Sequence, residues 1–154
     1  MTLWTNLYLI HDLPDDTIAE AVSTVFGVSR SDVSVEAAGE PSARSPQGIA
    51  IIRDDFRWQL PETRFPIELT IVLPDALAVG DRETPWHLAR LARQLDVPFL
   101  VSLPTDDQDT SRLAMPNGEL LSRSDDNEGD IVYEPGDAER LAPYLPKDAL
   151  PLAS

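Results

Sequence analysis

The side chains best suited to chemistry in this chain are carboxylates, which gather in the stretch SRSDDNEGDIVYEPGD at 122–137. Six acidic residues stand there against one base, Arg123. A calcium loop of the EF-hand type needs acids at alternate positions, glycine at the sixth and glutamate at the twelfth. Counted from Asp125, the sixth residue is Asp130 and the twelfth is Gly136. The spacing argues against calcium, and we expect neither a metal nor another cofactor.

The two histidines, His11 and His87, are the remaining candidates for zinc binding or for a general base. They lie in different expected elements, and no H-E-x-x-H pattern is present. His11 stands at the end of an expected strand, where a local hydrogen bond is the simplest role. His87 shares an expected helix face with Arg90 and Arg93, a small basic patch suited to an anion, although a solvated helix face explains it as well.

The sequence patterns of nucleophilic and phosphate chemistry are absent. Neither G-x-S-x-G, G-x-x-x-x-G-K-[ST] nor G-x-G-x-x-G occurs. The chain has no cysteine, which excludes disulfides, thiolate metal sites and a cysteine nucleophile. Adjacent acids such as Asp54 and Asp55 do not indicate the pairing across a cleft that acid–base catalysis needs. We therefore predict no catalytic residue and interpret the chain as a binding protein.

The charge of the chain favours a basic partner. Its formal net charge is −15 and its sequence pI is about 4.2, so it repels nucleic acid and anionic membranes and attracts basic proteins. Residues 104–139 hold 11 acids and 2 bases, which is more than half of the net charge. Self-repulsion makes such a concentration costly to stability, which favours a function. A solvated edge without a partner is the alternative.

Two expected loops carry these acids, one at 105–109 and one after the hairpin predicted around Asn117-Gly118. Pairing of that hairpin would bring the loops together at one end of a sheet, where their fields add and steer a basic partner. We predict that they form the partner-binding surface. The predicted contact residues are Asp106, Asp107, Asp109, Asp125, Asp126, Glu128, Asp130, Tyr133 and Glu134.

Tight complexes also need aromatic or apolar anchors. Trp58, Trp86 and Tyr133 are the candidates, and burial in the core is expected for at least two of them. Two other hypotheses remain open. The chain would be an enzyme of unrecognised type with a site around His87, or a structural subunit that associates with its own copies through an open sheet edge. Monomer and homodimer are not distinguished.

Periodicity predicts the elements that must position these residues. Apolar runs, alternating or unbroken, predict strands at 3–10, 32–38, 49–56, 66–75, 97–103, 112–115, 120–123 and 130–134. A first helix follows Pro14 and ends at Gly27. A second is expected to have Thr84 as its N-cap and Trp86 on its buried side, and Asp137 is expected to cap a third at 138–145.

These elements predict an α+β fold. We expect a mostly antiparallel sheet of about six to seven strands, two main helices packed on one face and a short C-terminal helix. The length suits one domain over residues 1–154 with a frayed tail at 146–154. The N-terminus lacks the pattern of a secretory signal, and no apolar run approaches the ~18 residues of a membrane span. We therefore expect a soluble, cytoplasmic protein.

A small, cysteine-free, strongly acidic α+β chain without catalytic motifs resembles the immunity proteins of bacterial polymorphic toxin systems. The likeness lies over roughly residues 84–121, where TPWHLARLARQLDVPFLVSL precedes LAMPNGELL. These runs are similar to helix–strand–hairpin segments of such bacterial proteins. The resemblance implies stoichiometric binding that blocks a partner toxin, such as a basic nuclease, in the cytosol. It assigns no role to any single residue.

Overall fold

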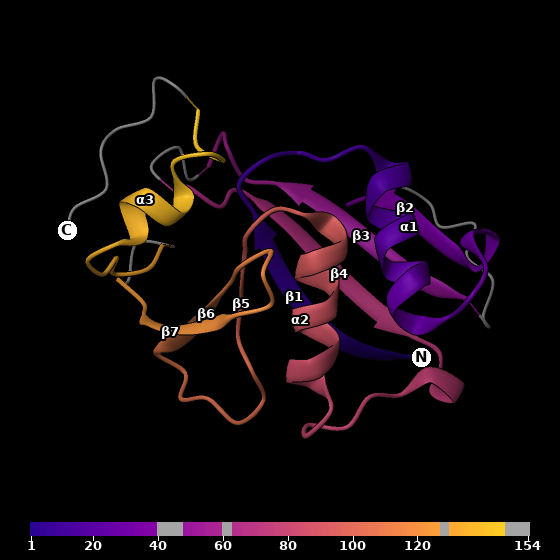
Figure 1. The fold of residues 1–154 in the computed structure, drawn as a ribbon. Coiled ribbons are helices and arrows are strands. Elements are labelled where there is room, and N and C mark those ends of the chain that lie inside the picture. The colour runs from indigo at the N-terminus through magenta and orange to yellow at the C-terminus, as the bar shows by residue number, and fades with distance from the viewer. Residues whose placement is uncertain (40–47, 60–62, 127–129, 147–154) are drawn as a thin grey trace.

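The computed structural model describes residues 1–39, 48–59, 63–126 and 130–146. It confirms the predicted class, with a seven-stranded, mostly antiparallel sheet, two main helices that pack together and a short C-terminal helix (Figure 1). The strands are β1 (Thr2–Leu9), β2 (Val33–Ala37), β3 (Ile49–Asp55), β4 (Ile67–Leu73), β5 (Phe99–Val101), β6 (Thr110–Ala114) and β7 (Leu120–Ser124). The helices are α1 (Asp15–Phe26), α2 (Thr84–Leu95) and α3 (Asp137–Leu141), with short 3₁₀ turns η1 (Arg30–Asp32) and η2 (Asp75–Leu77). Of the expected frayed tail at 146–154, only Pro146 is within the described residues.

The sheet is built around the N-terminal strand. Its order is β2-β3-β4-β1-β5-β6-β7, so that β1 lies in the middle, antiparallel to both β4 and β5. β2 and β3 are parallel, while the other neighbouring strands are antiparallel. The alternation of β4 shows which face of the sheet is buried in the core. Its apolar residues Ile67, Leu69, Ile71 and Leu73 all lie on that face.

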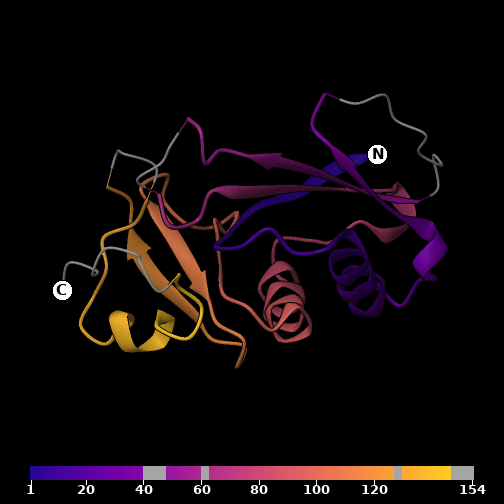
Figure 2. The same cartoon turned by 90° about the horizontal axis from the view of Figure 1, so that it is seen from above.

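Helices α1 and α2 cover that apolar face. Ile18 and Val22 of α1 and Leu88 and Leu91 of α2 are buried in one cluster with the inward residues of the central strands. Gly27 ends α1 in the left-handed conformation, as predicted, with φ of 66°. Figure 2 shows both helices on one side of β1, β3 and β4, with no helix on the other side.

Helix α3 covers the opposite face at the other end of the sheet. Leu141 of α3 is buried against Leu100 of β5 and Leu113 of β6 in a second apolar cluster. Leu100 and Leu113 are register partners, whereas their neighbours Phe99 and Ala114 belong to the α1–α2 cluster. The two faces of β5 and β6 are therefore covered by different helices, whereas no helix of the described residues covers the face of β1, β3 and β4 opposite α1 and α2.

A buried ion pair fixes α3 to β7. Arg123 Nε and Nη2 donate to the two carboxylate oxygens of Asp137 at 2.9 and 2.7 Å. The Asp137 side chain is fully buried and the Arg123 side chain is 7% exposed. Arg140 and the backbone N–H of Glu134 also donate to this carboxylate. The prediction that Asp137 caps the helix was wrong, because Gly136 stands at that position and the carboxylate is used inside the molecule.

The predicted strand at 130–134 does not form. Only an isolated bridge joins Ile131 to Asp125 beyond the end of β7. The bridge is made by the Val132 N–H, which donates to the Ser124 carbonyl, and by the Asp126 N–H, which donates to the Asp130 carbonyl. The Ile131 N–H takes no part in it and donates to the Asp130 carboxylate. Pro135, which follows the apolar run, has no N–H with which to extend the pairing.

The hairpin predicted around Asn117-Gly118 forms, with a five-residue connection between β6 and β7 in which Gly118 has φ of 94°. The start of the second helix differs from the prediction. Helix α2 already includes Thr84, and Glu83 precedes it. The Thr84 hydroxyl donates to the Gly80 carbonyl rather than capping the helix.

Replacing Asp137 should be strongly destabilising. In Asp137→Asn the buried Arg123 guanidinium loses its main charge partner, and breaking such a pair costs about 3 kcal/mol in the free energy of unfolding. Urea unfolding followed by circular dichroism measures the loss. The control is Glu139→Gln, an exposed residue of the same helix. Equal unfolding midpoints for the two variants would refute the role of the pair.

The same pair should make stability depend on acid. Burial raises the pKa of Asp137, but hydrogen bonds from Arg123, the Glu134 N–H and Arg140 lower it further, so the net shift is downward. The stabilisation is complete above the ordinary aspartate pKa of about 3.9 and is lost as the pH falls through the lowered folded-state value. The stability difference between the natural chain and Asp137→Asn should therefore shrink below about pH 4. A difference that stays constant in urea titrations down to about pH 2 would contradict this.

Candidate partner-binding site

A cavity of about 440 Å³ opens where the two acidic loops meet the connection between β3 and β4. Tyr8 of β1, Leu100 of β5 and Ser111 of β6 contribute to it from the sheet. Their neighbours Leu7, Leu9 and Phe99 point into the α1–α2 core, so by strand alternation the cavity lies on the opposite face. The remaining walls are Phe56, Thr63, Phe65, Val101, Ser102, Asp109, Asp125, Asp130 and Ile131.

The β6–β7 pairing brings the two acidic loops together, as the sequence predicted. Thr110 pairs with Ser124 at the end of the ladder. The next residues outward are therefore neighbours, and the Asp125 N–H donates to the Asp109 carbonyl at 2.9 Å. The Ser111 hydroxyl donates to the Asp125 carboxylate at 2.6 Å. Two carboxylates that are 16 positions apart in sequence thus line one cavity.

Asp130 supplies the third carboxylate of the cavity from the segment that leads to α3. Its oxygens accept hydrogen bonds from the Tyr133 hydroxyl at 2.9 and 3.0 Å and from the backbone N–H groups of Ile131 and Arg64. Burial raises the pKa of Asp130 above its ordinary value, and these hydrogen bonds only partly offset that effect. The nearby charge of Asp126 raises it as well. Burial also raises the pKa of Tyr133, reinforced by the Asp130 carboxylate.

A second tyrosine–carboxylate pair lies at the sheet wall. Tyr8 and Glu68 are register partners in β1 and β4, and the Tyr8 hydroxyl donates to Glu68 at 2.9 Å. Burial, together with this hydrogen bond and the charge of Glu68, raises the pKa of Tyr8 to about 12. The hydroxyl protons of Tyr8, Ser111 and Tyr133 are all directed to carboxylates. Two of the acidic side chains of the cavity, Asp125 and Asp130, are held in place by donors from within the chain.

The nine predicted contact residues fall into three groups. Asp109, Asp125 and Asp130 line the cavity, with Tyr133 behind Asp130. Four more predicted contact residues do not line the cavity. Asp106 is paired through both carboxylate oxygens with Arg112, and Glu134 is paired with Arg123. The Asp126 carboxylate accepts a hydrogen bond from the Asp130 N–H, and Asp107 is exposed. Glu128 lies outside the described residues.

Asp106 illustrates how pairing removes an acid from the surface. Its side chain is only 8% exposed, and Arg112 donates to it at 2.8 and 2.9 Å. Hydrogen bonding to Arg112 lowers the pKa of Asp106. The sequence predicted both Asp106 and Asp109 as contact residues, but of the two only Asp109 lines the cavity.

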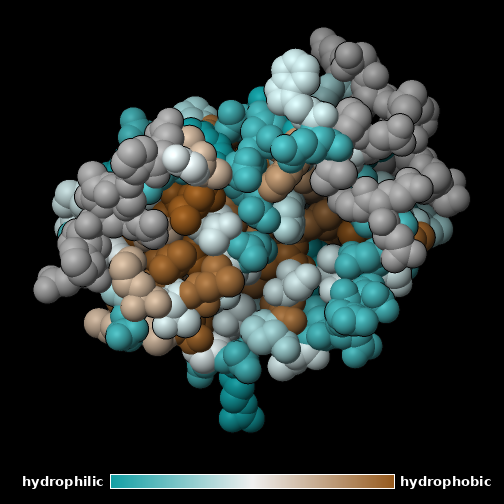
Figure 3. Space-filling view, turned by 180° about the vertical axis from the view of Figure 1, so that it is seen from behind, coloured by the Kyte–Doolittle hydropathy of each residue, from teal (hydrophilic) through white to brown (hydrophobic). Residues whose placement is uncertain are grey.

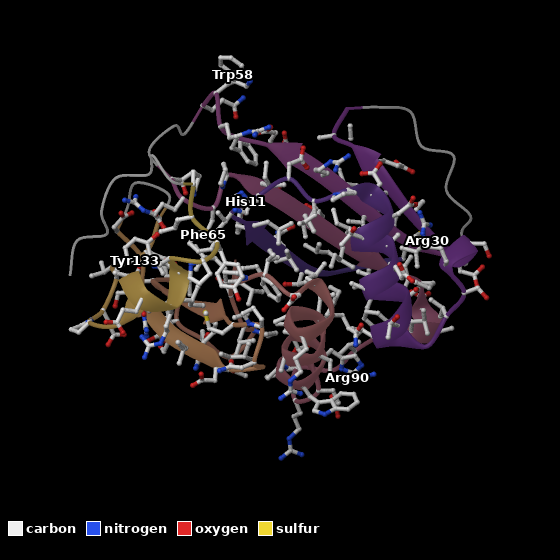
Figure 4. All side chains as sticks on the ribbon, turned by 45° about the horizontal axis from the view of Figure 1, so that its top comes forward. His11, Arg30, Trp58, Phe65, Arg90 and Tyr133 are labelled. Atoms are coloured by element: carbon white, nitrogen blue, oxygen red, sulfur yellow. The ribbon has the colours of Figure 1, made fainter. Side chains whose placement is uncertain are left out.

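The expectation that at least two of the three aromatic candidates are buried was wrong. Trp58 is 93% exposed and Trp86 is 59% exposed, while Tyr133 is half-buried. Trp58 lies on the turn after β3, two residues from Phe56 of the cavity wall. Figure 4 shows Trp58 projecting away from the body of the molecule, far from Arg90 on α2. Trp86 is covered on one side by the Arg90 guanidinium, 4.6 Å from its ring centroid.

The uncovered sheet face continues from the cavity as an apolar surface. Ile52 of β3 and Val72 of β4 alternate with residues of the α1–α2 core and so point to this face, where both are half-buried. Leu3, the register partner of Val72, is 53% exposed. Figure 3 shows hydrophobic residues gathered on the face seen from behind, with hydrophilic residues around them.

The walls that the sequence did not single out include Tyr8, Phe56, Phe65 and Ser111. Of these residues, Tyr8 was the one that the sequence could best have predicted. It lies between Leu7 and Leu9 in a strand, so its side chain must point to the sheet face opposite theirs. Phe56 and Phe65 flank the connection between β3 and β4. Their approach to β1 depends on strand order, which the sequence did not reveal.

The histidines lie in other surroundings. His11 Nε2 hydrogen-bonds the carbonyl of Tyr144, 133 positions away, so its bond is not the local one expected. His87 is half-buried, and its ring contacts Trp4, Phe26 and Trp86. Arg90 and Arg93 of the expected basic patch donate to the backbone carbonyls of Val25 and Asn117. The patch is therefore largely engaged in packing α2 against its neighbours.

Within the described ranges, no group of three or more histidine or acidic residues is placed to hold a metal ion. No described helix is both long and apolar enough to cross a membrane. Comparison of the chain with protein-family models, curated proteins and solved structures found no match. The candidate site therefore depends on its geometry and charge.

Asp130 should titrate above the ordinary aspartate value of about 3.9. Replacing Tyr133 with phenylalanine should raise its pKa further, because the lost hydroxyl donated to the charged carboxylate. Carbon-13 NMR of the carboxyl group measures both values, with Tyr144→Phe as the control. Since the folded-state pKa is raised, the stabilising contribution of Asp130 is complete below its ordinary pKa and is lost as the pH rises through the raised value. An unchanged or lower midpoint in Tyr133→Phe would show that the hydrogen bond does not act in this way.

Proposed function

We propose that this chain is a cytosolic binding protein that blocks a basic partner protein, such as a toxin or nuclease, by stoichiometric binding. The observation that carries the proposal is the acidic cavity beside a sheet face with exposed apolar residues, which none of the helices in the described part of the chain covers. Interfaces commonly combine an apolar centre with a polar rim. Here Leu3, Ile52 and Val72 on the outward face of β1, β3 and β4 supply the first and the acidic loops the second.

Charge supports a basic partner over an acidic or neutral one. The net charge of −15 attracts cationic proteins over distance. Among the described residues that line the cavity, three are aspartates and none is a lysine or arginine. Asp109 and Asp125 are brought together by the β6–β7 pairing, at a cost in like-charge repulsion that a cationic partner would relieve. The same field explains why nucleic acid is not proposed as the ligand.

Trp58 gives the proposed interface an anchor. A tryptophan that is 93% exposed buries little of its ring in the free protein, yet tryptophan is among the residues that contribute most when buried in complexes. It lies on the turn after β3, two residues along the chain from Phe56 of the cavity wall. The charged loops would steer the partner, and Trp58 with the apolar face would hold it.

Removing the cavity charges should slow association. After the partner is captured from the native cell, Asp109→Asn with Asp125→Asn should lower its association rate roughly 10-fold at low salt and weaken the salt dependence. The matched control is Glu20→Gln with Glu139→Gln, which removes the same charge from exposed positions on α1 and α3. Equal rates for the two double variants in surface plasmon resonance would contradict a role for the cavity.

Removing the anchor should speed dissociation. Trp58→Ala should weaken binding of the captured partner by about 2 kcal/mol, close to 30-fold in Kd. Its unfolding free energy should hardly change, because the ring is exposed. Trp86→Ala removes another exposed tryptophan, from α2, and should leave the Kd unchanged. Equal losses of affinity in the two variants, or none in either, would argue against the proposed surface.

A further inference from the structure

We propose that the cavity is an arginine pocket, which receives the guanidinium group of one arginine side chain presented by the basic partner. This inference rests on the proposed function and adds to it the chemical group that is recognised. It follows from three properties of the cavity walls: which hydrogen-bonding atoms they offer, which of their charges have no arginine or lysine partner within the described residues, and which aromatic side chains they include.

The hydrogen-bonding atoms of the acidic wall call for a donor-rich ligand. The hydroxyl of Ser111 gives its proton to Asp125, and that of Tyr133 gives its proton to Asp130. The Tyr8 hydroxyl is likewise directed to Glu68. These groups leave mainly oxygen lone pairs for a ligand. A guanidinium has five N–H donors and no acceptor, which matches such a wall.

The charges of the cavity are separate from the ion pairs inside the protein. Arg112 is bound by Asp106, and Arg123 is bound by Asp137 and Glu134. None of these residues is a wall of the cavity. Arg64 lies beside the Asp130 wall, with its guanidinium 5.9 Å from the Tyr133 ring centroid, but it does not line the cavity. Arginines thus pair with Asp106, Asp137 and Glu134. Of the cavity aspartates, Asp125 is bound by the Ser111 hydroxyl and Asp130 by hydroxyl and amide donors, while Asp109 is exposed.

The aromatic walls favour arginine over lysine. Tyr8, Phe56 and Phe65 line the same cavity as the three aspartates. A planar guanidinium stacks on aromatic faces and binds carboxylates through two parallel hydrogen bonds, whereas an ammonium is a compact and strongly hydrated charge. The cavity volume of about 440 Å³ admits an extended side chain. Burial of Asp130 adds to the preference, because a poorly solvated carboxylate gains most from a paired cation.

A direct test uses the full chain and N-acetyl-arginine methylamide, followed by two-dimensional amide NMR. The arginine probe should cause saturable shifts at the amides of Asp109, Ser111, Asp125 and Ile131. The lysine counterpart at equal ionic strength should bind several-fold more weakly. The citrulline counterpart, which keeps the planar shape but lacks the charge, should give no saturable shift. The double variant Asp109→Asn, Asp125→Asn should weaken arginine binding at least about 10-fold, and Glu20→Gln with Glu139→Gln should leave it unchanged.

Several outcomes would overturn the inference: no saturable shift with arginine up to its solubility limit, equal binding of citrulline, equal binding of lysine, or unaltered binding in the cavity variant. The test does not require the partner, so its failure is distinct from that of the proposed function. If the probe fails while the cavity charges still control association with a captured partner, only the arginine pocket is refuted. If the probe binds but no basic partner depends on the cavity, the proposed function falls instead.

Discussion

The buried pair between Arg123 and Asp137 is the interaction on which the candidate site depends most. It fastens the segment after β7 and helix α3 to the sheet face opposite α1 and α2. It acts together with the second apolar cluster, in which Ile131 and Leu141 are buried. Residues 130–136 lead into α3 from the cavity, where Asp130 is one of the walls. One arginine thus organises acids that would otherwise repel one another.

The acidic segment divides into two classes according to what holds each carboxylate. Asp106 and Asp137 are bound by arginines and have lowered pKa values. They belong to the architecture. Asp125 and Asp130 are bound by hydroxyl and amide donors, which orient a carboxylate without neutralising it. This division concentrates uncompensated charge in a cavity with aromatic walls, where a bound cation would be partly shielded from water.

The sequence predicted the fold class well because the signals that define it are local. Alternation in β4 and the apolar stripe of α1 follow directly from residue spacing, and so does the approach of the two acidic loops once β6 and β7 are paired. The cavity itself could not be predicted, because Phe56, Phe65 and Tyr8 meet only through the strand order. The strand expected at 130–134 is reduced to an isolated bridge between Asp125 and Ile131. Burial was expected for at least two of Trp58, Trp86 and Tyr133 because large aromatic residues usually are buried, but both tryptophans are exposed.

The central claim is that the partner docks on the uncovered sheet face at the acidic cavity. Hydrogen–deuterium exchange of the chain with and without its captured partner tests this most directly. The account predicts slower exchange at the amides around Asp109, Asp125, Ile131 and the turn bearing Trp58, with no change at the exposed side of α2 around Trp86. Protection confined to α2, with unchanged exchange around the cavity, would contradict it.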